Sequence, residues 1–151
     1  MRRKEKEIVE KNEIEAVIAA AKVCRLAMAD NGQPYIVPLC FGYADDVLYF
    51  HFAMEGKKLD ILKQNNRVCF EFDIDTEIKI GKTACQWGMK FRSVIGFGQA
   101  YFIEDPESKR SALDTIMRQY SNDAFEFPDE TVAKTVVIRV EIESMTGKRA
   151  D

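Results

Sequence analysis

Strict alternation of apolar and polar residues is the feature that most constrains how this chain can fold. It is clearest in RVCFEFDID (67–75), where every second residue from Val68 to Ile74 is apolar, and in TVVIRVEIE (135–143). A period of two residues is that of an extended strand with one buried face, whereas a helix would scatter these side chains around its axis. Both segments are therefore predicted to be β-strands.

Further strands are predicted for four segments: residues 23–30, 34–43, 47–53 and 90–105. The first two flank Asn31-Gly32, the strongest short signal for a hairpin. The third follows a turn at 44–46, so the first three strands are expected to form an antiparallel meander. In the fourth, Gly96 and Gly98 share one face, which permits a bend or the close approach of a neighbouring segment.

Helical spacing of apolar residues is found in three other segments: residues 12–22, residues 56–66, and the stretch from Asp105-Pro106 to Tyr120. Asp105 and Pro106 form a good N-cap and first-turn pair. Residues 76–88 show no firm period. A chain of 151 residues with 46% hydrophobic residues fits one domain, 1–151. The expected fold is mainly β, a small six-stranded antiparallel barrel with helical covers.

Composition argues against several classes of function. The formal net charge of -3, without a sustained basic stripe, disfavours binding to nucleic acid. The start of the chain is charged and no apolar run approaches the roughly 20 residues needed to cross a bilayer, so a cytoplasmic protein without a membrane segment is expected. The four cysteines have no paired spacing, so neither a metal site nor a disulfide scaffold is expected.

Cations occur at three unusual positions. Lys57 and Lys58 open the second predicted helix, at the end where the helix dipole favours anions. They form either a solvated face or a site for a negative ligand. Arg25 interrupts an apolar strand, where a guanidinium needs an anion or a carbonyl partner, and Arg92-Ser93 stands at the head of the glycine-containing strand. Such cations near a lysine-rich helix start are what a phosphate pocket without a glycine-rich loop requires.

The only histidine, His51, lies in the strand 47–53. It shares a face with Val47 and Tyr49, while Leu48 and Phe50 line the other face. Both faces are largely apolar, as expected if one looks into the barrel and the other toward a partner subunit or a ligand. His51 is either a structural residue or a functional one, and no second histidine or Ser/Asp pattern accompanies it.

Four stretches together resemble a known family: CRLAMADNGQPYIVPLCFGY (24–43), LYFHFAMEGKKLDIL (48–62), RVCFEFD (67–73) and CQWGMKFRSVIGFGQAYFIED (85–105). In this order they resemble the pyridoxamine 5'-phosphate oxidase-like flavin-binding split barrels, in particular the nitroimidazole-resistance (nitroreductase-like) branch. Each motif is loose by itself, while four in register, over about half of the chain, are fairly specific. The resemblance implies a six-stranded antiparallel split β-barrel of the FMN-binding type.

The resemblance also implies a homodimer that holds two FMN molecules at the subunit interface. Arginine and lysine residues and a polar strand residue of the family contact the phosphate or ribityl chain, the second strand lies beside the isoalloxazine ring, and a histidine lies next to the flavin. The matching residues here are Arg25, Pro38, Leu39, His51, Lys57, Lys58, Arg92 and Ser93.

The sequence departs from the oxidases of the family in three ways. Lys57 replaces an arginine, Ser93 replaces a glutamine, and the end MTGKRAD has no counterpart of the substrate-binding segment, so oxidation of pyridoxamine phosphate is not expected. The implied function is an FMN-dependent oxidoreductase that passes electrons from a reduced nicotinamide to a small planar acceptor such as a nitroaromatic or a quinone, with His51 as proton donor or ring contact. The alternatives are a non-catalytic flavin-binding or sensing module, and a haem or deazaflavin binder on the same barrel.

Overall fold

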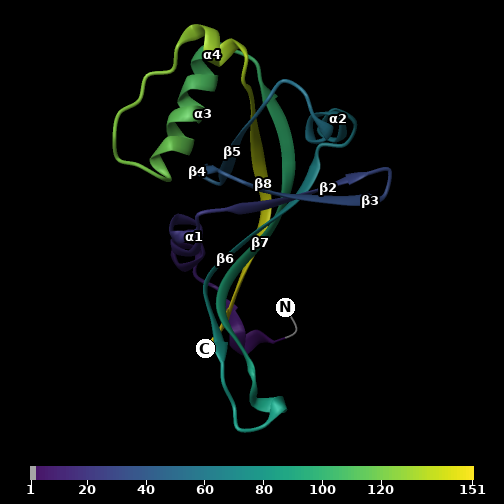
Figure 1. Cartoon of the computed structure of the whole chain (residues 1–151), viewed down its shortest axis with the longest axis vertical. Coiled ribbons are helices and arrows are strands. Elements are labelled where there is room, and N and C mark those ends of the chain that lie inside the picture. The colour runs from purple at the N-terminus through teal and green to yellow at the C-terminus, as the bar shows by residue number, and fades with distance from the viewer. Residues whose placement is uncertain (1–2) are drawn as a thin grey trace.

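The structure, a computed structural model, describes residues 3–151 as one antiparallel sheet with helices on its faces (Figure 1). The strands are β1 (Glu7–Ile8), β2 (Cys24–Asp30), β3 (Gln33–Leu39), β4 (Gly42–Ala44), β5 (Val47–Phe52), β6 (Arg67–Lys79), β7 (Gly88–Ile103) and β8 (Val136–Ala150). The helices are α1 (Lys11–Ala20), α2 (Lys57–Gln64), α3 (Pro106–Arg118) and α4 (Asp129–Ala133), with short 3-10 turns η1 (Lys4–Lys6) and η2 (Ala84–Gln86).

The strand order is β3-β2-β6-β7-β8-β5-β4, and β1 pairs with β8. The long strands β6, β7 and β8 run side by side, while β2 and β3 cross them at a steep angle (Figure 1). All six predicted strands are present, although the second is divided into β3 and the three-residue β4, and β1 is a short addition of two residues. The mainly β, antiparallel split-barrel prediction is therefore confirmed.

The predicted meander of the first three strands is wrong in its third member. β5 pairs with β4 and β8 rather than with β3. The reason lies at Phe41, where the expected second strand breaks: its ring is fully buried against Phe72 at 4.8 Å between centroids. Its backbone N–H donates to the Tyr120 hydroxyl at 3.0 Å instead of to a neighbouring strand. The chain therefore leaves the β2–β3 hairpin at this point and joins the opposite edge of the sheet.

Turn and cap signals in the sequence are confirmed. Asn31 and Gly32 both have positive φ, 48° and 86°, and connect β2 to β3 as a two-residue loop. The side chain of Asp105 caps α3 by accepting a hydrogen bond from the backbone N–H of Ser108 at 2.8 Å. That bond holds the pKa of the Asp105 carboxyl below its ordinary value. These local signals hold because they depend on neighbours within a few residues.

The main core fills the inner face of the sheet beneath α1 and α2. The alternation in β6 places Val68, Phe70 and Phe72 in this core as predicted. On the outer side of β5 and β8, α3 and α4 cover a second cluster that includes Val137. One face of β5 was expected to look toward a partner subunit or a ligand, but at Tyr49 the face away from the main core packs against the α3 cluster.

Residues 76–88, which show no sequence period, form the end of a long arm. β6 and β7 extend beyond the barrel, with a register irregularity between Ile74 and Glu77, and η2 closes the tip (Figure 1). Ile78, Ile80 and Trp87 on this arm are all more than half exposed. Among residues 3–151, no helix combines the length and the apolar character that a membrane crossing demands.

Candidate functional site

Lys57 and Lys58 stand at the open N-terminus of α2, as predicted. Gly56 is the N-cap with φ 140°, a conformation that glycine tolerates, and open space surrounds its Cα. The Lys57 Nζ lies 4.7 Å from the centroid of the Tyr35 ring, and the Lys58 Nζ lies 5.2 Å from that of Phe52. Within residues 3–151 neither ammonium group pairs with a carboxylate. The two charges are held against aromatic faces and can still receive an anion.

Arg25 lies on the outer face of β2, directly between Pro38 of β3 and Glu71 of β6. Its Nη1 donates to the Glu71 Oε2 at 3.1 Å and also contacts the Asp73 carboxylate. The bond to Glu71 raises the pKa of Arg25. Burial and the nearby Asp73 raise the pKa of Glu71, because together they outweigh the opposite effect of the guanidinium. The anion partner expected for Arg25 is thus supplied by β6.

Arg92 and Ser93 are neighbours in sequence but face opposite sides of β7. Ser93 pairs in register with Asp73 and lies on the same outer face as Arg25. Arg92 points toward α1, where it lines a cavity of about 320 Å³ and its Nε lies 3.9 Å from Asp75. Of the two, Ser93 is the residue that the structure brings next to the Arg25 cluster.

The remaining predicted residues lie on different surfaces. Pro38 is exposed beside Arg25, and Leu39 is half-buried against the main core. His51 is exposed near the end of β5, paired in register with Val137, on the face opposite to Phe50 and the main core.

Within one chain the predicted residues therefore form separate groups. Lys57 contacts Tyr35, which pairs with Met28, three residues along β2 from Arg25. Three residues of strand span about 10 Å, and Tyr35 and Arg25 lie on opposite faces of the hairpin. No hydrogen bond or ion pair within residues 3–151 joins the lysine pair to Arg25 or Ser93.

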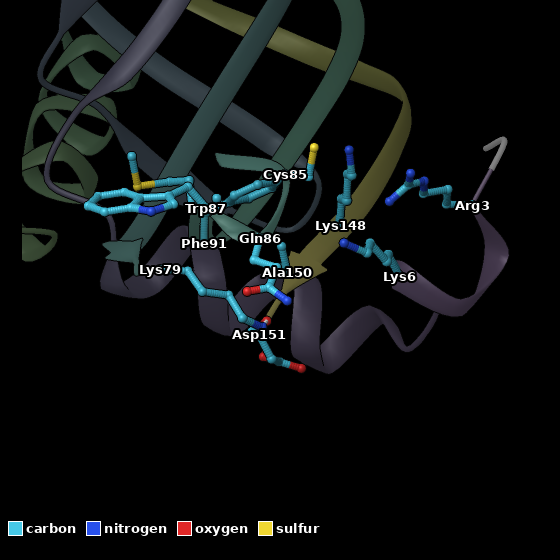
Figure 2. Close-up of a pocket in the computed structure, with 12 residues that line it drawn as sticks. Arg3, Lys6, Lys79, Cys85, Gln86, Trp87, Phe91, Lys148, Ala150 and Asp151 are labelled. Carbon is cyan, nitrogen blue, oxygen red and sulfur yellow. Dashed lines mark hydrogen bonds between the residues drawn. The ribbon is translucent and has the colours of Figure 1, made fainter. Parts of the chain in front are cut away.

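A cavity that sequence reasoning missed lies where the arm, the end of β8 and the N-terminal segment meet (Figure 2). Its volume is about 600 Å³, and Trp87, Phe91 and Lys148 are among its lining residues. Lys148 pairs in register with Ser93, so this cavity adjoins the outer face that carries Arg25. Two signals could have found it: Phe91 and Ser93 share a face by parity, and Trp87 falls within a stretch that carries the family resemblance.

Comparisons with known proteins found one matching family and several similar chains. Residues 10–149 match the family described as pyridoxamine 5'-phosphate oxidase. A curated relative, an uncharacterized protein of Rhizobium meliloti (strain 1021), is 34% identical over 64 residues, and this match spans 42% of either chain. A solved structure of a candidate 5-nitroimidazole antibiotic resistance protein from Bacteroides thetaiotaomicron is 40% identical, with a TM-score of 0.86 over 94% of this chain and 85% of that one. An FAD-binding protein from Mesorhizobium loti is 29% identical, with a TM-score of 0.67 over 95% and 96%.

Proposed function

Because the chain belongs to the pyridoxamine 5'-phosphate oxidase family, we propose that it is a flavin-dependent oxidoreductase and that its cofactor is FMN. The observation that carries the proposal is the lysine pair at the open start of α2. The barrel that carries this helix is the fold of a family that includes flavin proteins. A phosphate placed there would meet two ammonium groups that no carboxylate neutralises and the free N–H groups at a helix N-terminus.

The residues fit FMN unequally. Lys57 and Lys58 are free to bind the phosphate, and Gly56 leaves room for its close approach. Ser93 and Pro38 present a hydroxyl and an apolar surface on the outer face. Arg25 is already engaged by Glu71 and Asp73, so it would have to exchange a carboxylate for a phosphate or serve only to order these strands. The phosphate assignment therefore rests on the lysines rather than on Arg25.

We propose a small planar acceptor, a nitroaromatic or a quinone, and a reduced nicotinamide as the electron source. The similarity to the resistance protein from Bacteroides thetaiotaomicron supports the nitroaromatic class. When bound, a flavin supplies the redox chemistry, and this chain supplies charge, an apolar surface and protons. Histidine is the side chain that most often serves as a general acid in enzymes, and His51 is exposed on β5, so we assign it the delivery of a proton.

We also propose that the protein acts as a homodimer through the outer face of the sheet. Ile36, Ala27, Cys69 and Phe97 form one register row across β3, β2, β6 and β7. Ile36 is 60% exposed and Phe97 is 51% exposed, which is a costly arrangement for large apolar side chains in water. A second copy that covers this row would bury them and would bring outer-face residues of both chains together.

The test is the visible spectrum of the purified protein, followed by titration with FMN and with riboflavin. FMN should bind more tightly, because riboflavin lacks the phosphate. The double change Lys57→Gln and Lys58→Gln should weaken FMN binding by about 2 kcal/mol or more, roughly thirtyfold, and leave the affinity for riboflavin unchanged. Lys63→Gln is the matched control, since Lys63 is an exposed lysine at the other end of the same helix.

Equal affinity for FMN and riboflavin would remove the role given to the lysines. A visible spectrum typical of haem or of a deazaflavin would show that the cofactor is one of these rather than FMN. The protein would be a binding or sensing module rather than an enzyme if its bound, reduced FMN passed electrons to acceptors no faster than free reduced FMN does.

A further inference from the structure

The cavity beneath the arm has the size of a small-molecule site. Its volume of about 600 Å³ lies within the range of about 300–1,000 Å³ typical of ligand pockets. Three parts of the chain that are distant in sequence form it: the N-terminal segment, the arm from Lys79 to Phe91, and the end of β8. None of the residues predicted to bind the flavin lines it.

Positive charge gathers on one side of this cavity. Arg3, Lys6 and Lys148 lie together there, while Lys79 lines the cavity on the side of Trp87 (Figure 2). Among residues 3–151, Asp151 is the one acidic residue of the lining. Figure 2 shows Arg3 and Lys6 extending toward Lys148. This arrangement follows from the pairing of β1 with β8, which sets Glu7 opposite Lys148 and so brings Lys6 close.

Few of these cations have a polar partner among residues 3–151. The Lys79 Nζ donates to the Asp151 carbonyl at 2.8 Å, and the Lys148 Nζ lies 5.6 Å from the centroid of the Phe91 ring. Among residues 3–151, no carboxylate forms an ion pair with Arg3, Lys6 or Lys148. Like charges that converge repel one another, and a bound anion would relieve that repulsion.

The other side of the cavity is aromatic and apolar. Trp87 and Met89 are 53% and 48% exposed, so neither side chain is buried in the core, and Phe91 lines the cavity beside them. An indole with one open face stacks well on a planar ring. Cations on one side and open aromatic faces on the other match a ligand in which a planar ring and an anionic group are joined.

We propose that this cavity binds an aromatic phosphate, its ring against Trp87 and its phosphate among Arg3, Lys6 and Lys148. The phosphate is favoured over a single carboxylate because Arg3, Lys6 and Lys148 converge on one side and form no ion pair among residues 3–151. The assignment goes beyond the proposed function and does not depend on it, since it rests on the lining of the cavity alone. A nucleotide and FMN share this chemistry, and the experiment separates them.

Trp87 is the only tryptophan of the chain, so its fluorescence reports on this cavity directly. The protein as purified is titrated with adenosine 5'-monophosphate, adenosine and inorganic phosphate, with calorimetry as a second measure of binding. We expect saturable quenching by adenosine 5'-monophosphate and at least tenfold weaker binding of adenosine. Inorganic phosphate should compete for the site without quenching as strongly, because it has no ring to stack.

Two single variants test the lining. Lys148→Gln and Lys6→Gln should each weaken the binding of adenosine 5'-monophosphate about tenfold and leave the affinity for adenosine unchanged. Lys134→Gln is the matched control, because Lys134 pairs with Glu130 outside the cavity and should change nothing. By calorimetry, Trp87→Ala should weaken both adenosine compounds, while Trp87→Phe should retain most of the affinity. Thermal melts of every variant check that the fold is intact.

Equal affinity for adenosine 5'-monophosphate and adenosine would overturn the proposal, as would unchanged binding in Lys148→Gln or the absence of saturable binding. Calorimetry with protein saturated with FMN then identifies the source of the ligand. If FMN excludes adenosine 5'-monophosphate, and Lys148→Gln also weakens FMN, the aromatic phosphate held here is the flavin's own. If both bind at once, the cavity is a separate nucleotide site. If the protein does not bind FMN at Lys57 and Lys58, the proposed function fails, but the titrations with adenosine 5'-monophosphate still test this cavity.

Discussion

Gly96 is the position where the close packing of this barrel can be tested most directly. It lies on the inner face of β7, opposite Phe70 of β6. A Cβ added at Gly96 would lie 2.1 Å from the Phe70 Cζ, far inside van der Waals contact. The ring has little freedom to move away, because Phe70 is fully buried and its centroid lies 5.9 Å from that of Phe72. Gly96 is therefore expected to be required by the core.

The change Gly96→Ala should destabilise the fold by about 1–2 kcal/mol. Overpacking of a core costs about 1–3 kcal/mol, and the lower entropy of an unfolded chain with alanine offsets about 0.5–1 kcal/mol of it. For a chain of this length the midpoint of thermal unfolding should fall by roughly 2–8 °C. Urea unfolding followed by circular dichroism measures the free energy directly.

A matched control and a double-mutant cycle make the result decisive. Gly88→Ala places its Cβ in open space and should change stability by less than about 0.5 kcal/mol. Phe70→Leu removes the ring atoms that meet the new methyl group, so the double variant should be more stable than the sum of the single effects by about 1 kcal/mol. Additive effects, or Gly96→Ala as stable as Gly88→Ala, would refute this account of the packing.

Three further predictions concern the proposed function and the charged cluster. His51→Ala should leave FMN bound and slow the oxidation of prereduced protein by a nitroaromatic about 10²-fold, measured by stopped flow at matched flavin occupancy; weaker FMN binding with unchanged turnover would instead show that His51 only packs on the ring. Phe97→Glu should convert the proposed dimer to a monomer in light scattering, and a dimer that survives this charge would place the interface elsewhere. Burial and Asp73 raise the pKa of Glu71, so the folded chain binds a proton at this carboxylate more tightly than the unfolded chain does. The free energy of unfolding should therefore rise as the pH falls through the raised pKa toward the ordinary value of 4.5. Glu71→Gln should remove that part of the pH dependence in unfolding titrations, and an unchanged profile would contradict the assignment.

The sequence alone determined the features that depend on near neighbours. Period-two alternation located β6 and β8 and identified the buried face of β6, because the side-chain direction of a strand alternates whatever the partner. Asn31-Gly32 located the hairpin and Asp105 located the start of α3, since backbone conformation and capping are settled within a few residues. The resemblance identified the family from motifs in order along the chain.

Only the tertiary structure decided which segments meet. The sequence located β5 but not its partner β8, about 90 residues away, because strand pairing is a contact between distant segments. In the same way, the structure supplied the carboxylates around Arg25. The cavity beneath the arm combines Lys6 with Lys148 from opposite ends of the sequence, and no local pattern records that proximity. Local conformation follows from local chemistry, whereas a site assembled across the sheet exists only once strand pairing has fixed its neighbours.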